Sequence, residues 1–103
     1  MSTPTRMRAR LNGDVAEIRI LMTHPMDTGT RKNSAGEIVP AHYITDVDIT
    51  LGGRPVLAAK WSVAVSQDPF LALRTGGAKA GDKLVVSWKD NTGDSRSDEI
   101  TLA

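Results

Sequence analysis

The two histidines, His24 and His42, are the side chains of this chain best suited to chemistry, and eighteen positions separate them. An imidazole is a common ligand of zinc and iron, but such a centre takes three or four good ligands. The sequence has no cysteine, so two histidines without carboxylate help are too few. We therefore expect no metal site. His24 is predicted to make a backbone hydrogen bond in a loop, and His42 to lie at the edge of a strand.

A nucleophilic active site is the second chemistry that the histidines suggest. It requires a serine or threonine held next to a basic side chain. Hydroxyl side chains are frequent in the chain, but none lies in a strained Gly-x-Ser-x-Gly elbow. We predict neither a catalytic residue nor a cofactor.

Two loops have compositions that are typical of ligand-binding motifs, but their spacing is wrong. The segment Asp90–Asp94 lacks the twelve-residue calcium pattern with its terminal glutamate. Its Asp and Asn residues predict a hairpin turn, because both tolerate turn geometry. The segment Arg74–Lys83 is rich in glycine and lysine but lacks the spacing of a phosphate-binding P-loop. We expect it to be a flexible surface loop.

The most informative segment is His24–Lys32, which is followed by the strand-like run Ile38–Ile44. It combines turn residues with charges of both signs, which is more typical of a recognition feature than of a plain connector. We expect Arg31 and Lys32 to lie on a protruding loop and to orient protein partners. The residues assigned to this loop, with its docking role, are His24, Pro25, Met26, Gly29, Arg31 and Lys32.

Alternation of apolar and polar residues with period two predicts β-strands along nearly the whole chain. Met7–Leu11 and Ala16–Met22 flank a turn at Asn12–Asp14 and predict a hairpin, and a long loop at 24–37 follows. Further strands are predicted at Tyr43–Leu51, Val56–Lys60, Trp61–Val65, Phe70–Leu73, Leu84–Trp88 and Ile100–Leu102. About seven or eight short strands with one apolar face each predict an all-β sandwich of two antiparallel sheets.

Length and charge limit the function classes. The 103 residues suffice for a single domain, 1–103, and the net charge of +1 gives no support for binding nucleic acid or a membrane. The charge is uneven, because residues 1–34 carry +3 and residues 82–103 carry −2. The first ten residues are polar and basic, without the apolar run of a signal peptide.

Five segments of the chain carry a family resemblance: His24–Lys32, Ile38–Ile44, Ser66–Leu71, Lys79–Lys83 and Val86–Gly93. Together they make the chain resemble the SoxZ family of the bacterial thiosulfate-oxidising Sox system. The resemblance covers nearly the whole chain in the expected order, and the length also agrees.

The resemblance implies an immunoglobulin-like β-sandwich that forms a heterodimer with SoxY. In that heterodimer a cysteine on the C-terminal arm of SoxY carries the sulfur substrate between Sox enzymes. The other Sox enzymes make transient contacts with this SoxY–SoxZ carrier. The SoxZ subunit supplies no catalytic group, and the absence of cysteine agrees with this division. The resemblance also implies a periplasmic location, which the chain would reach by export together with its signal-bearing partner. We also expect an apolar patch on one sheet face as the SoxY interface.

Two other interpretations share the fold. A superoxide-reductase-like iron domain has similar His-Pro-Met and His-Tyr-Ile segments, but its iron site needs four histidines and one cysteine, which this chain does not have. A generic immunoglobulin-like adaptor would bind its partner by strand addition, and the arginine-bearing edge at residues 6–10 would suit it.

Overall fold

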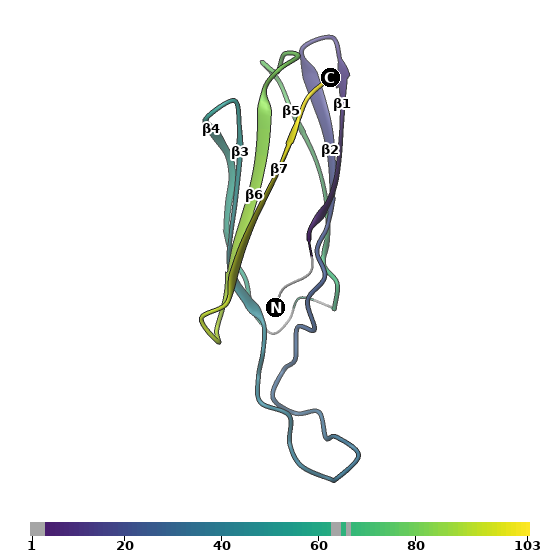
Figure 1. The fold of residues 1–103 in the computed structure, drawn as a ribbon, viewed down its shortest axis with the longest axis vertical. Helices are drawn as coiled ribbons and strands as arrows, with labels where there is room; N and C mark the ends of the chain where they lie inside the picture. Colours follow the sequence, from purple (N-terminus) through teal and green to yellow (C-terminus); the bar gives the residue numbers. More distant parts are fainter. Residues whose placement is uncertain (1–3, 63–64, 66) are drawn as a thin grey trace.

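The computed structural model describes residues 4–62, 65 and 67–103, which form two antiparallel β-sheets that face each other (Figure 1). The strands are β1 (Arg6–Asn12), β2 (Val15–Leu21), β3 (Ile44–Leu51), β4 (Arg54–Lys60), β5 (Phe70–Thr75), β6 (Lys83–Asp90) and β7 (Ser95–Thr101). The prediction of an all-β sandwich is confirmed. Within the described ranges there is no helix with the length and apolarity needed to cross a membrane.

The three-stranded sheet has the order β1-β2-β5 and the four-stranded sheet the order β4-β3-β6-β7. Tight turns join the hairpin partners. Between β3 and β4, Gly52 and Gly53 have φ angles of 60° and 81°. Positive φ at both central residues is the geometry of a type I′ hairpin turn, which glycine adopts without steric cost. Two consecutive glycines are therefore well suited to this turn.

The core lies between the sheets and is built mainly from aliphatic side chains that alternate along the strands. In β2 the buried apolar positions are Ala16, Ile18 and Ile20, and in β6 they are Leu84, Val86 and Trp88. Each strand contributes one face, as period-two alternation requires. Trp61 lies outside the strands and packs against the core, while Val63 and Ala64 of the predicted strand 61–65 fall outside the described residues.

A long arm, residues 27–42, extends from one end of the sandwich (Figure 1). The sequence predicted a loop to residue 37 and then a strand at Ile38–Ile44, whereas β3 begins only at Ile44. The arm folds back on itself as a hairpin with two isolated bridges, Asp27 with His42 and Lys32 with Ile38. The longest dimension of the molecule is consequently 53 Å, against 22 Å and 19 Å across it.

Candidate functional site at the base of the arm

Both histidines meet at one carboxylate where the arm joins the sandwich. The Nε2 atoms of His24 and His42 lie 3.1 Å and 2.7 Å from the same oxygen, Oδ2 of Asp90. The imidazole rings lie edge to face with centroids 4.6 Å apart. The side chains of His24 and Asp90 are 2% and 0% exposed, whereas that of His42 is 35% exposed. The cluster is therefore sealed from solvent except at His42.

Three separate segments position these side chains. His24 follows β2, and its backbone is fixed by reciprocal bonds with Asp68, whose Oδ1 accepts from His24 N and whose N–H donates to His24 O. His42 is placed by its antiparallel bridge with Asp27, with N···O distances of 2.7 Å and 3.0 Å. Asp90 is the last residue of β6. The cluster thus ties both sheets to the arm.

The second oxygen of Asp90 organises the β6–β7 turn. Its Oδ1 accepts from the backbone N–H of Thr92 at 2.9 Å, from the Thr92 hydroxyl at 2.7 Å and from the N–H of Asp94 at 3.0 Å. Burial by itself would raise the pKa of Asp90, but the hydrogen bonds from Thr92, His24 and His42 outweigh it and hold the pKa far below its usual range. Asp90 is therefore a buried carboxylate that stays ionised.

The tautomer of His24 follows from its two neighbours. Met26 donates its backbone N–H to His24 Nδ1 at 3.1 Å, so Nδ1 carries a lone pair. The proton of a neutral imidazole then lies on Nε2, where it points to Asp90. His24 thus links the backbone just before the arm to the buried carboxylate, and its ring also lies edge-on to Trp88 with centroids 5.2 Å apart.

The same hydrogen bonds bear on metal binding. His24, His42 and Asp90 place one ligand atom each within 4.8 Å of one another, so their types and spacing fit a three-ligand cation site. A metal on Nε2 of a neutral His24 would require the proton on Nδ1, where Met26 already donates. The donor pattern therefore favours a hydrogen-bonded structural cluster over a metal centre. The predicted backbone hydrogen bond of His24 is confirmed.

Met26, which directly precedes the arm, and Gly29, which lies within it, shape the start of the arm. Met26 is buried with a φ of 48°, and its sulfur accepts the N–H of Ile44 at 3.3 Å. Gly29 has a φ of 85°, and a Cβ there would lie 3.3 Å from the Cβ of Ala41. Close approach and positive φ both favour glycine, so this position keeps the two sides of the arm together.

The residues assigned to the docking loop differ in burial. His24 and Met26 are buried at the base, Gly29 is half-buried, and Pro25, Arg31 and Lys32 are exposed. Arg31 donates from Nε and Nη2 to the two carboxylate oxygens of Asp27, and this hydrogen bonding lowers the pKa of Asp27. Within the described ranges Lys32 forms no ion pair, so it is the free basic group of this loop.

Asp90 is the residue that sequence reasoning missed. Its segment was interpreted only as a turn, which the structure confirms through the Asp90 N–H bond to Asp94 O at 2.9 Å. The turn is also hydrogen-bonded to the end of the arm. Asn91 Oδ1 accepts from Tyr43 N–H and Asn91 Nδ2 donates to Ala41 O, both at 2.8 Å. Turn composition could not have revealed this, since the partners are 48 and 50 positions away.

No outer sheet face is uniformly apolar within the part of the chain that the structure describes. The exposed large apolar side chains there are Leu21, Ile38 and Phe70. The prediction of a homogeneous apolar patch on one sheet face is therefore wrong for the part of the chain that the structure describes. The outward positions of the strands carry mostly charged and polar side chains, because the apolar ones were used for the core.

Comparison with known families gives a match over almost the whole chain. The model of a family described as sulphur oxidation protein SoxZ matches residues 5–101. The matched range contains all seven strands, the arm and the histidine–aspartate cluster. The comparison with curated proteins finds no match.

Proposed function

Because the chain belongs to the SoxZ family of sulphur oxidation proteins, we propose that it is the non-catalytic subunit of a SoxYZ-type sulfur carrier in the periplasm. A SoxY-like partner holds the sulfur substrate on the cysteine of its C-terminal arm. The present chain supports that partner and presents it to successive Sox enzymes. The observation that carries this proposal is the family match across 5–101, and the lack of any cysteine agrees with it, since the covalent sulfur must then reside on the partner.

The arm gives this subunit a means of presenting its partner. Arm residues 30–38 are all exposed, while the base is fixed by Asp90 and Asn91. The exposed tip is itself a hydrogen-bonded hairpin, through the bridge of Lys32 with Ile38 and the bond from Asn33 N–H to Glu37 O. Such a tip is suited to contact with another protein, because little ordering of the backbone remains to be done on binding.

Co-purification tests the proposed function. Tagged protein recovered from the native periplasm should bring down an equimolar SoxY-like protein whose intact mass shows sulfur-containing additions on a C-terminal cysteine. Recovery of the chain alone, or with an unrelated ligand, would overturn the proposal and favour a generic adaptor.

Lys32→Glu tests the docking role of the arm. We expect slower turnover of the carrier complex by purified Sox enzymes at low salt, by several-fold, with the difference disappearing at high salt, because exposed rim charges act mainly on association rates. Arg31 is left intact because it holds Asp27. Lys79→Glu, on the loop before β6, is the control with the same charge change and should turn over normally. Equal rates for Lys32→Glu and wild type at low salt would exclude the role.

A further inference from the structure

Five arginines cover the outer face of the three-stranded sheet. In β1 the arginines alternate with Met7, Ala9 and Leu11. These three apolar side chains pack against the core, so the arginines of β1 point outward. The five are Arg6, Arg8 and Arg10 of β1, Arg19 of β2 and Arg74 of β5, and we call their surface the arginine face. The acidic residue among its outward positions is Glu17, so the formal charge of the face is +4, from five arginines and one glutamate.

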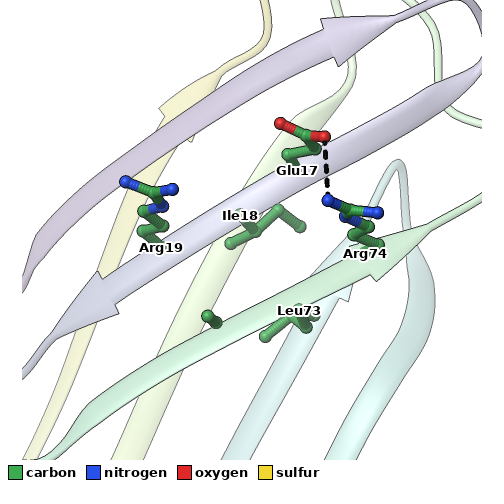
Figure 2. A pocket seen from close by; sticks show the side chains of 6 residues that line it. Glu17, Ile18, Arg19, Leu73 and Arg74 are labelled. Carbon is green, nitrogen blue, oxygen red and sulfur yellow. Dashed lines mark ion pairs between the residues drawn. The ribbon is translucent and has the colours of Figure 1, made fainter.

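The strand register brings like charges together on this face. Arg8 and Arg19 are direct cross-strand partners, which is destabilising for like charges. Glu17 lies between Arg10 and Arg74 and pairs with Arg74 at 3.5 Å. Figure 2 shows this pair across β2 and β5, with Arg19 farther along β2 and away from it. Within the described ranges, the other four arginines form no ion pair.

The outer face of the four-stranded sheet is different. It balances three acids against three lysines: Asp46, Asp48 and Glu99 against Lys60, Lys83 and Lys89. Two ion pairs, Lys60 with Asp46 and Lys83 with Glu99, neutralise most of it. Of the two outer sheet faces, only that of the three-stranded sheet therefore carries a large net charge.

An apolar margin adjoins the arginine face. Leu21 lies between Arg6 and Phe70 in the register, and Leu21 and Phe70 are 36% and 60% exposed. Arginine and aromatic side chains are enriched at the centres of protein interfaces, whereas obligate interfaces are more apolar than this surface. Arginines on an edge strand are sometimes explained by the need to prevent edge-to-edge aggregation alone. This explanation does not apply to Arg19, because β2 is the central strand of the sheet. The composition fits a partner that binds and leaves.

We propose that the arginine face is a docking surface for the acidic face of a protein that binds the carrier transiently. The proposal rests on the proposed function, which supplies a series of such partners. Guanidinium groups spaced along adjacent strands match carboxylates on a facing surface, because each can bind a carboxylate through two parallel hydrogen bonds. Leu21 and Phe70 add the desolvated contact that charges alone do not provide.

A pair of matched double variants tests the arginine face. Arg8→Glu with Arg19→Glu and, as control, Lys83→Glu with Lys89→Glu change the net charge equally and lie on opposite sheets. Each chain is combined with the SoxY-like partner, and its association rate with purified Sox enzymes is measured at low and high salt. We expect the arginine variant to associate about tenfold more slowly with at least one enzyme at low salt only, and the lysine variant to be near wild type.

Equal slowing in both double variants would overturn the proposal, since net charge would then explain the effect. Loss of SoxY pairing in the arginine variant alone would also overturn it, because the face would then be the permanent interface. If Arg8→Glu with Arg19→Glu does not fold, Arg8→Gln with Arg19→Gln replaces it and should give a smaller slowing of the same kind.

A second measurement does not depend on the proposed function. The isotope-labelled full chain is titrated with decaglutamate and, separately, with sodium sulfate, and amide shifts are recorded by NMR. Decaglutamate should shift amides of β1, β2 and β5, and sulfate at equal charge should shift them far less. Shifts spread evenly over both sheets, or an equal response to sulfate, would overturn the docking surface even if a SoxY-like partner had been found.

Discussion

Asp90→Asn is expected to lower the free energy of unfolding by about 3 kcal/mol, measured by urea denaturation at neutral pH. The substitution keeps the size of the side chain but replaces one of the two carboxylate oxygens with an NH₂ group, which donates. The oxygen replaced is either Oδ2, which both histidines share, or Oδ1, which accepts from Thr92 and Asp94. The Nε2–H of His24 then either faces the donating NH₂ group or bonds to a neutral oxygen in place of a charged one. His24 cannot move its proton to Nδ1, because Nδ1 accepts the N–H of Met26. A buried donor without a partner is costly because it has also lost its water.

Asp48→Asn is the matched control for this prediction. Asp48 lies on the exposed face of β3, so the same change there should alter the free energy of unfolding by less than about 0.5 kcal/mol. Similar losses for the two variants would show that the Asp90 cluster contributes nothing beyond an ordinary surface carboxylate.

The stability difference between wild type and Asp90→Asn should depend on pH in one direction. The folded-state pKa of Asp90 lies below the unfolded value, so its contribution is complete above the unfolded pKa of about 3.9 and is lost as the pH falls from there toward the folded pKa. The two proteins should therefore differ most at neutral pH and converge in acid. A difference that stays constant from neutral pH to strongly acidic solution would contradict the ionised state of Asp90.

His24→Ala is expected to be far more destabilising than His42→Ala, by about 3 kcal/mol against about 1 kcal/mol. Removing the His24 ring leaves a cavity beside Trp88 and takes away the acceptor of the Met26 N–H. His42 is partly exposed, so water can replace its contact with Asp90. Thermal and urea unfolding of the two variants measure the difference directly.

The two histidine variants control for each other, because each removes one imidazole and one hydrogen bond to Asp90. Nitrogen NMR of the wild-type rings adds an independent check, since His24 should carry its proton on Nε2. Equal losses of stability, or a proton on Nδ1 of His24, would contradict the arrangement described for the base of the arm.

The strands and turns could be predicted from the sequence because they follow local rules. Alternating side chains point to opposite faces of a strand, so Ile18, Ile20, Val86 and Trp88 mark the core without any knowledge of pairing. The turns at Asn12–Asp14 and Gly52–Gly53 follow from residues that tolerate positive φ. The family could be predicted too, since its segments run through the chain in order. The sequence predicted a protruding loop but did not predict that it folds back as a hairpin. The two bridges of that hairpin, Asp27 with His42 and Lys32 with Ile38, join residues that follow no regular sequence pattern.

Only the tertiary structure decided which distant residues meet. His24 and His42 are 66 and 48 positions from Asp90. Each of the three has a satisfactory local explanation: His24 as a loop residue, His42 as a strand-edge residue and Asp90 as a turn residue. The arginine face likewise depends on β5 pairing with β2, which places residues 70–75 beside residues 16–21. Sequence periodicity sets the face on which a side chain lies, because it depends on backbone geometry alone. The neighbour across that face is set by sheet order and register, which depend on how the whole chain buries its apolar surface.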